Sequence, residues 1–330
     1  MKKYLYFTIT LLFSFFTLQT VSAKIELSVP FTSQAPYGKW IPPWDNACEE
    51  ASTLMIDLYY QNYGASTIDK EIATSKINRL IDIENNYLGL NIDNNAEQMA
   101  YIINNFLFWE AFVVEDPTLE QLKHEIDVGH PFILPVAGPD LHNPYYDSDN
   151  VDYHAFVVKG YDDKTQEFIV QDPGTSHGLD FRYSYDTIMT AMHDFLPKNQ
   201  TYKGNKVAVF TTPTISDSKN LDGDKDGLNK EQELKYGSTL FFTDSDGDGY
   251  SDGNEVANGY SPTKATRTLL DGILVKTPNN PKVYLMENGT KRWIISEKVF
   301  LNNGWNWSDI KIVNSSILDK EIISGINISE

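Results

Sequence analysis

Cysteine and basic residues are both scarce in this chain of 330 residues. It has 27 lysines and arginines against 46 aspartates and glutamates, which gives a formal net charge of −19. Such a surface repels a phosphate backbone, so the composition argues against binding to nucleic acid or to an anionic bilayer and favours cationic partners such as metal ions. Hydrophobic residues make up 41% of the chain, which is enough for a packed core and excludes wholesale disorder.

Long hydrophobic runs are absent after residue 23. Lys2 and Lys3 precede an apolar run at residues 4–18, and small residues follow at 21–23, an arrangement that predicts a secretory signal peptide, residues 1–23, removed by cleavage. A membrane anchor, the alternative, needs about 20 apolar residues. Cleavage leaves 25 basic and 46 acidic residues, a net charge of −21. We therefore expect a secreted or cell-surface protein with no membrane span after cleavage.

The single cysteine, Cys48, has no second cysteine with which to form an intramolecular disulfide, although exported proteins commonly pair their cysteines. A lone thiol is either buried and inert or retained for its reactivity. A helical pattern begins close to Cys48, after Asp45-Asn46 as expected caps, and a helix N-terminus favours the nucleophilic thiolate. Glu49 and Glu50 oppose ionisation of the thiol unless their side chains point away.

Three compositional regions follow the signal: residues 24–213, 214–263 and 264–330. In the first region, helical patterns come before strand patterns, which predicts an α+β domain. The helical patterns begin at Ala51 and cover 96–107 and 119–128, and the strand-like runs are 132–136, 154–160, 167–171 and 206–211.

A nucleophilic cysteine needs a base, and the base needs an acceptor that orients it. Of the six histidines, His154 opens a strand directly after a polar loop, where a strand end can hold an imidazole at the edge of a cleft. A hairpin through residues 162–163 would bring Asp172, at the end of the next strand, level with His154. Spacing alone supports this pairing only weakly, because a histidine at a strand start is more often structural. The other five histidines are His124, His130, His142, His177 and His193.

Five ordered blocks within residues 24–213 carry a resemblance to a known family. They are Val29-Pro-Phe-Thr-Ser-Gln34, Cys48-Glu-Glu-Ala-Ser-Thr-Leu-Met55, Tyr153-His154-Ala-Phe-Val-Val-Lys-Gly-Tyr-Asp162, Phe168-Ile-Val-Gln-Asp172-Pro-Gly174 and Tyr185-Asp-Thr-Ile-Met-Thr-Ala-Met-His-Asp194. These blocks resemble the papain-like cysteine peptidases of the bacteriocin-processing (double-glycine) type, and more closely their exported, transporter-free branch.

The resemblance implies a papain-like domain with N-terminal helices packed on an antiparallel sheet. It implies Cys48 as nucleophile, His154 as general base and then acid, and Asp172 as the acceptor that fixes the imidazole tautomer. Gln34 would donate to the oxyanion together with the backbone N–H of Cys48. No cofactor is expected for catalysis. The sequence departs from the bacteriocin-processing members in having Glu49 where they usually have glycine, which leaves substrate preference open.

Residues 214–263 contain eleven acidic residues against four lysines, and two loops in them share a ligand pattern. The second loop has carboxylates at positions one, three, five, nine and twelve and glycine at six, a spacing typical of calcium. The first loop begins 22 residues earlier and has Lys230 at position nine, so it is predicted to bind more weakly or to take a ligand from water or its neighbour. The predicted ligands are Asp222, Asp224, Asp226, Leu228 (backbone carbonyl) and Glu233 in the first loop, and Asp244, Asp246, Asp248, Tyr250 (backbone carbonyl), Asp252 and Glu255 in the second.

An EF-hand would flank each loop with long amphipathic helices, and only short helical stretches follow these two. The pattern instead resembles the thrombospondin type 3 calcium repeats of bacterial surface proteins over residues 217–263. The alternative for this segment is a solvated acidic linker. With calcium bound, the segment is expected to act as a stiffened spacer, since its carboxylates repel one another without the ion.

The last region, residues 264–330, is predicted to be a small α+β module of unknown function. Residues 283–286 and 292–295 flank Asn288-Gly289, which is a strong hairpin signal. Its tryptophans are expected to form a core more often than a sugar-stacking surface. Lys282, Lys291 and Arg292 suggest a basic face for an acidic wall polymer or glycan, although a solvated hairpin explains them equally well.

The sequence as a whole predicts an exported cysteine peptidase that hydrolyses peptide or amide bonds through a thioester. Its substrate would be a peptide or protein, with cell-wall peptide as one option, and calcium its metal partner. Two alternatives remain open. One is a catalytically inactive, calcium-dependent surface adhesion protein, and the other is a transpeptidase that uses an amine acceptor.

Overall fold

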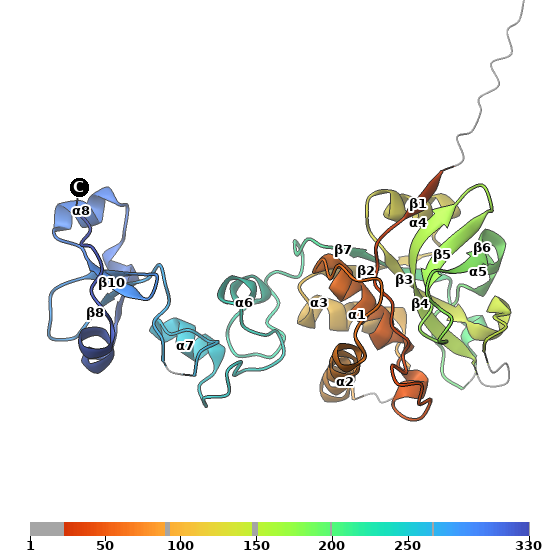
Figure 1. The fold of residues 1–330 in the computed structure, drawn as a ribbon, viewed down its shortest axis with the longest axis horizontal. Helices are drawn as coiled ribbons and strands as arrows, with labels where there is room; N and C mark the ends of the chain where they lie inside the picture. The colour runs from red at the N-terminus through yellow and green to blue at the C-terminus, as the bar shows by residue number, and fades with distance from the viewer. Residues whose placement is uncertain (1–22, 90–92, 147–150, 199, 266, 330) are drawn as a thin grey trace, which may run out of the picture.

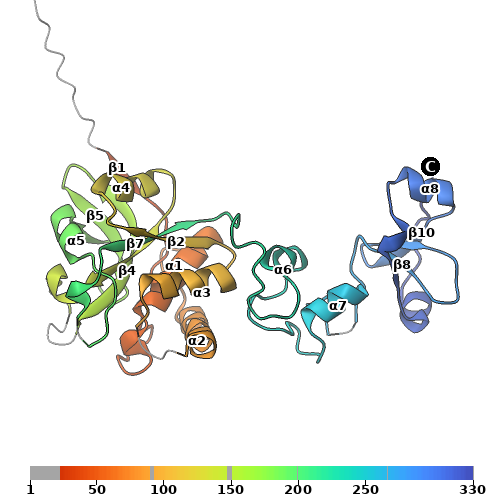
Figure 2. The same cartoon turned by 180° about the vertical axis from the view of Figure 1, so that it is seen from behind.

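The computed structural model describes residues 23–89, 93–146, 151–198, 200–265 and 267–329. Figure 1 shows a large N-terminal domain, a middle segment with two short helices, and a small C-terminal module, and Figure 2 shows the same arrangement from behind. The expected signal peptide at residues 1–23 lies outside the described residues except for Ala23. Within the described residues, no helix combines the length and the apolar character needed to cross a bilayer.

The N-terminal domain is built on a seven-stranded sheet in the order β2-β7-β3-β4-β5-β6, with β1 also paired to β4. Every strand pair in this sheet is antiparallel. The strands are β1 (Lys24–Glu26), β2 (Glu110–Glu115), β3 (Phe132–Ala137), β4 (Tyr153–Asp162), β5 (Glu167–Gln171), β6 (Phe181–Ser184) and β7 (Val207–Thr212).

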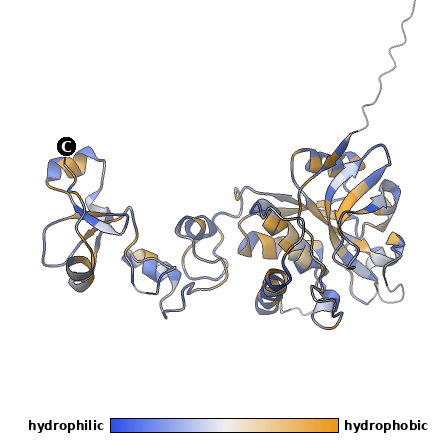
Figure 3. Cartoon of the chain, viewed as in Figure 1, coloured by the Kyte–Doolittle hydropathy of each residue, from blue (hydrophilic) through white to orange (hydrophobic). Residues whose placement is uncertain are grey.

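Helices cover both faces of this sheet, so the domain is α+β as the sequence predicted. The helices α1 (Cys48–Tyr60), α2 (Lys70–Tyr87) and α3 (Ala96–Phe106) pack on one face, and α4 (Leu119–Asp127) and α5 (Tyr185–Ala191) pack on the other. Alternate residues of β4 enter opposite cores: Ala155 and Val157 face α1, and Phe156 and Val158 face α4 and α5. Burial on both faces explains why β4 reads as a continuous apolar run. Figure 3 shows apolar residues concentrated on these helices and strands.

The middle segment carries α6 (Lys230–Tyr236) and α7 (Asp252–Asn258), one after each acidic loop. Both helices end at a glycine in the left-handed conformation, Gly237 and Gly259, a common helix terminator. The two helices have seven residues each, which fits the expectation of short helices rather than those of an EF-hand.

The C-terminal module contains a second sheet in the order β10-β9-β8-β11, together with α8 (Glu297–Asn302). The predicted hairpin is confirmed: β9 (Tyr284–Glu287) pairs antiparallel with β10 (Thr290–Trp293), and Asn288 and Gly289 both have positive φ, as a type I′ turn requires. The other strands are β8 (Leu274–Lys276) and β11 (Ile310–Ile312).

The basic face that the sequence suggests for this module is not formed, because two of its three residues make contacts within the module. Lys291 is buried and donates to the carbonyl oxygen of Leu318, and Arg292 pairs with Glu287. Trp305 packs against the core, whereas Trp307 is 52% exposed and stacks on Phe300. The tryptophans therefore divide between core and surface.

Candidate active site

Cys48 is the first residue of α1, with its side chain buried. The helix has Ala47 as its N-cap, without a side-chain cap hydrogen bond, and the expected caps Asp45 and Asn46 lie in the preceding 3-10 turn. Ser52, one turn into α1, donates from Oγ to the carbonyl oxygen of Ala155 at 3.3 Å. This contact joins α1 to the start of β4, the strand that carries His154.

His154 and Asp172 form a buried pair. His154 Nε2 lies 2.8 Å from Asp172 Oδ1, and Asp172 is 0% exposed. Oδ2 of Asp172 accepts from the hydroxyls of Tyr146 and Tyr183, each at 2.7 Å, and from Nδ2 of Asn143 at 3.2 Å. Burial acts to raise the pKa of Asp172, but His154 and these donors outweigh it and hold the pKa below its ordinary value. The carboxylate is therefore ionised and fixes His154 Nε2 as a donor, which leaves Nδ1 as the acceptor.

Two glycines permit this arrangement. A Cβ at Gly174 would lie 2.8 Å from His154 Cε1 and 2.9 Å from its Nε2, and a Cβ at Gly178 would lie 1.7 Å from the carbonyl oxygen of Asp172. Only glycine fits at either position without a shift of the surrounding atoms.

One cleft of about 970 Å³ is lined by Gln34, Cys48 and His154. The structure thus brings the predicted nucleophile, base and oxyanion donor to a single cleft, with Asp172 buried beside the base. Trp40 also lines the cleft, whereas Trp44 is not among its lining residues and packs against the core.

The side-chain amide of Gln34 is nearly buried, with 4% of the residue exposed. Its Nε2 donates to the carbonyl oxygen of Trp44 at 3.1 Å, and its backbone N–H donates to the carbonyl oxygen of Pro173 at 3.0 Å. An amide nitrogen has two hydrogens, so one remains to serve an oxyanion in the cleft. The backbone contact ties Gln34 to the loop that follows Asp172.

The thiol of Cys48 donates to Oε2 of Glu49 at 3.0 Å. From the sequence, Glu49 is predicted to oppose the thiolate unless its side chain points away, and in the structure the side chain points toward the sulfur. Burial, with Glu49 and Asp93 nearby, raises the pKa of Cys48 well above its ordinary value. The thiol is therefore protonated in this arrangement, and an active enzyme needs a base to ionise it.

Comparison with known proteins now decides the family. The model of the Peptidase_C39-like family matches residues 26–203, more than half of the chain. The chain belongs to this family. A solved structure from Bacillus anthracis, assigned as a C39-like peptidase, aligns with 58% of this chain and 98% of that chain at 16% sequence identity, with a TM-score of 0.38. None of the curated proteins compared with the chain matches it.

The C39 domain is thus a papain-like cysteine peptidase domain, in agreement with the broader part of the resemblance, the papain-like peptidase fold. Several residues around its cleft were not identified from sequence as part of the site: Asn143, Tyr146, Tyr183 and Asp93. The first three are scattered polar residues without a motif of their own. Only their contacts with Asp172 reveal them. Among the other histidines, His177 also lines the cleft, where it stacks on Tyr145 with ring centroids 4.2 Å apart.

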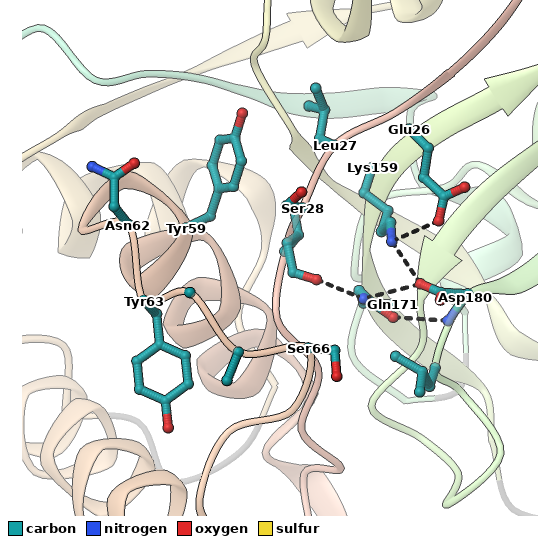
Figure 4. Close-up of a pocket in the computed structure, with 14 residues that line it drawn as sticks. Glu26, Leu27, Ser28, Tyr59, Asn62, Tyr63, Ser66, Lys159, Gln171 and Asp180 are labelled. Carbon is teal, nitrogen blue, oxygen red and sulfur yellow. Dashed lines mark hydrogen bonds and ion pairs between the residues drawn. The ribbon is translucent and has the colours of Figure 1, made fainter.

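A second cavity of the C39 domain, about 630 Å³, lies beside Lys159 and Gln171 (Figure 4). The buried ammonium of Lys159 pairs with Glu26 at 3.0 Å and with Asp180 at 2.6 Å. Gln171 Nε2 donates to the carbonyl oxygen of Val29 at 2.7 Å, and its Oε1 accepts from the backbone N–H of Asp180. These contacts hold both ends of the loop that carries Asp172, so the cavity residues support the active site.

The two acidic loops outside the C39 domain have the same local structure. Asp222 accepts from the backbone N–H groups of Lys225 and Gly227, and Asp244 accepts in the same way from Gly247 and Gly249. In each loop three carboxylates have oxygens within 4.8 Å of one another. They are Asp222, Asp224 and Asp226 in the first, and Asp244, Asp246 and Asp248 in the second.

The position-twelve residues of the loops, Glu233 and Glu255, are buried, and neither oxygen of either carboxyl has a hydrogen-bond partner in the described structure. Burial and the neighbouring aspartates raise the pKa of Glu233 to about 9 and of Glu255 to about 7. Asp252, predicted as the position-nine ligand, accepts from the backbone N–H and hydroxyl of Ser245 at 2.9 and 2.5 Å. Buried, unpartnered carboxylates beside three others fit a hard cation such as calcium.

Proposed function

We propose that the protein is an exported cysteine peptidase that hydrolyses peptide or amide bonds with Cys48, His154, Asp172 and Gln34. The observation that carries this proposal is the buried His154–Asp172 pair opening onto the cleft that Cys48 and Gln34 line. Membership of the C39-like family supports the reaction class. Export rests on the signal-like residues 1–23, and we place the protein in the exported, transporter-free branch.

The geometry suits acyl transfer. His154 Nδ1 takes the proton of Cys48, the thiolate attacks the substrate carbonyl, and Gln34 and the backbone N–H of Cys48 stabilise the oxyanion. His154 then gives its proton to the leaving amine, and a thioester remains on Cys48. Water, activated by the same imidazole, releases the acid. Asp172 holds the ring in one tautomer throughout.

A thiol-directed probe tests this assignment without knowledge of the substrate. Iodoacetamide should label Cys48 readily at neutral pH, because His154 accepts the thiol proton. In His154→Ala, the curve of labelling rate against pH should shift to higher pH. The labelled site is confirmed by mass spectrometry, since the chain has no other cysteine. If the apparent pKa of Cys48 is near that of a free thiol, about 8.5, and His154→Ala leaves it unaltered, then the assignment of His154 as the base is wrong.

We also infer that residues 214–263 form two thrombospondin type 3-like calcium sites in a spacer, with the ligands named from the sequence. The buried, unpartnered carboxylates of Glu233 and Glu255 support this inference. Bound calcium would neutralise the clustered carboxylates and stiffen the spacer. The C-terminal module would then attach the enzyme to a wall polymer or glycan, through exposed groups such as Trp307 and not through a basic face.

Calcium titration of the whole chain by calorimetry checks the sites. Asp248→Ala and Glu255→Gln should each weaken the second site at least about tenfold, because the number of charged ligands sets affinity. Glu231→Gln is the matched control, since Glu231 is exposed on α6 and is not a predicted ligand. If all three variants bind calcium as the unmodified chain does, the ligand assignment is wrong.

A further inference from the structure

Glu49 lies between the nucleophile and the segment that leads into α3. Its Oε2 is 3.0 Å from Cys48 Sγ, and its Oε1 accepts from the backbone N–H of Asn94 at 2.6 Å. Asn94 is itself held by the hydroxyl of Tyr153, which donates to its carbonyl oxygen at 2.9 Å. Only 1% of Glu49 is exposed. The side chain is thus fixed at both oxygens and contacts the reacting sulfur.

The protonation state of Glu49 decides what this contact does. An ionised carboxylate accepts from the thiol, and after the thiol loses its proton two anions would face each other at this distance with little water between them. A protonated carboxyl keeps Oε1 as the acceptor for Asn94 and has a hydrogen on Oε2. That hydrogen can turn toward the sulfur once the thiolate forms.

The surroundings of Glu49 favour the protonated form. Apart from the Cys48 thiol and the His154 imidazole, the titratable groups that face it are carboxyls and a phenol. None of the ion pairs found among the described residues involves Glu49, Glu50, Glu84 or Asp93. Burial and then Glu50 and Asp93 raise the pKa of Glu49 well above its ordinary value. Burial, with Glu49 adding to it, raises the pKa of Glu84 to about 7. Burial, with Asp152 and Asp45 adding to it, raises the pKa of Asp93 to about 6. The facing groups are Cys48 and Glu50 on α1, Glu84 on α2, Asp93 before α3, and Tyr153 and His154 on β4.

We propose that Glu49 is a further catalytic residue of the C39 domain, a neutral acid whose Oε2 hydroxyl donates a hydrogen bond to the Cys48 thiolate. This proposal rests on the proposed function, because it requires Cys48 to be the nucleophile. It gives a role to the residue that stands where the bacteriocin-processing relatives usually have glycine.

Protons balance in this step. The thiol proton passes from Cys48 Sγ to His154 Nδ1, and Glu49 keeps its own proton and only redirects it from its surroundings to the sulfur. The thiolate is then held by two donors, the imidazolium and the carboxyl. Attack on the carbonyl releases the sulfur from both hydrogen bonds, and collapse to the thioester returns the imidazole proton to the leaving amine.

Two substitutions separate the donor role from a repulsive one. In Glu49→Gln, the amide oxygen can accept from Asn94 and the amide nitrogen can donate to the sulfur at every pH. Glu49→Leu has a similar volume and no donor. We expect iodoacetamide to label Cys48 of Glu49→Gln at close to the rate of the unmodified protein at pH 7. Labelling of Glu49→Leu should be about tenfold slower, which corresponds to a rise of about one unit in the thiol pKa.

Infrared difference spectroscopy supplies a second readout that does not depend on labelling or on the stability of Glu49→Leu. The unmodified protein at neutral pH should show the carbonyl band of a protonated carboxyl, and part of this band should be missing from Glu49→Gln. Faster labelling of both variants would show an ionised Glu49 that opposes the thiolate, and equal labelling of all three proteins would show that Glu49 has no role. Either result overturns the proposal. So does an infrared spectrum of Glu49→Gln in which the carbonyl band is as strong as in the unmodified protein. A labelling profile that His154→Ala leaves unchanged would instead refute the proposed function itself.

Discussion

Replacing His154 by alanine is expected to lower kcat for peptide hydrolysis on the order of 10⁵-fold or more. The thiol of Cys48 is buried, and burial raises its pKa well above the ordinary value, so without a base very little thiolate forms at neutral pH. His154 Nε2 is fixed by Asp172 at 2.8 Å, which leaves only Nδ1 to receive the proton. The rate is measured on a mixture of fluorogenic peptides, with active protein counted by thiol titration.

The double variant His154→Ala/Asp172→Ala should be scarcely slower than His154→Ala alone. Asp172 acts through the imidazole, and residues that act as one unit show strongly non-additive effects. His124→Ala is the matched control because His124 is exposed on α4, away from the cleft, and it should keep the full rate. If His154→Ala retains activity within about 10²-fold of the unmodified protein, the low end of what a general acid–base group contributes, another base serves Cys48. His177, in the same cleft, would be the first to examine.

The pairing of His154 with Asp172 follows from strand positions that the sequence shows well. Both strands of the hairpin are marked by apolar runs, and the polar residues between them mark the turn. In the structure Gln171 lies opposite Val157 in the β4–β5 ladder, so Asp172 leaves the ladder just beyond and reaches His154 with its side chain. Strand patterning places the two residues at neighbouring strand ends, but spacing alone supports their pairing only weakly, and the resemblance to the papain-like peptidases is what selects it.

The direction of the Glu49 side chain could not be predicted in this way. Its position on the first turn of α1 is clear from sequence, but its direction depends on Asn94, which arrives from a segment 45 residues later. The helix α2 was also not predicted, because its buried side of Ala73, Ile77, Leu80 and Ile83 is a narrow stripe in a mostly polar segment. Local periodicity gives no information about a long-range contact such as that between Glu49 and Asn94, and it gives only a weak signal for a helix with so few apolar residues.

Lys230 is a second case in which the tertiary structure changes the meaning of a residue. At position nine of the first acidic loop, a lysine predicts weaker calcium binding, because it replaces a carboxylate ligand. The structure turns it away from the carboxylates and buries it against the C39 domain, where Nζ donates to the carbonyl oxygens of Asn104 and Trp109 at 3.1 and 3.0 Å and to Ser218 Oγ at 3.0 Å. The lysine is therefore a tether between the loop and the peptidase domain.

Other contacts strengthen this tether. Oε1 of Glu110, on β2, accepts from the backbone N–H groups of Asp217 and Ser218 at 2.8 and 2.6 Å and from the Ser218 hydroxyl at 2.8 Å. Arg79 of α2 lies over the ring of Phe242, with 3.6 Å to the centroid. The first loop is thus packed on the C39 domain and is not a free linker.

Calcium is therefore expected to raise the melting temperature of the C39 domain through the first loop. Glu233, the predicted position-twelve ligand, lies one turn after Lys230 on α6, so an ion that orders Glu233 also orders the helix that is bonded to the domain. Calcium at 100 times its Kd stabilises the bound form by about 2.7 kcal/mol, which corresponds to roughly 5–10 °C for a domain of this size. Unfolding is followed by differential scanning calorimetry of the whole chain, in which the C39 domain, as the largest folded unit, gives the transition with the largest enthalpy.

The matched variants Glu233→Gln and Glu255→Gln separate the two loops. Each removes one carboxylate from the same position of its loop, but only the first loop is bonded to the C39 domain through Lys230. Glu233→Gln should abolish most of the calcium-dependent shift in the melting temperature of the C39 domain, whereas Glu255→Gln should keep it. Equal shifts in the two variants would place the stabilising ion elsewhere, and no shift in the unmodified protein would show that calcium and the peptidase domain are uncoupled. The contacts of Lys230 predict coupling, because the buried ammonium can keep its three acceptors only while α6 stays in place.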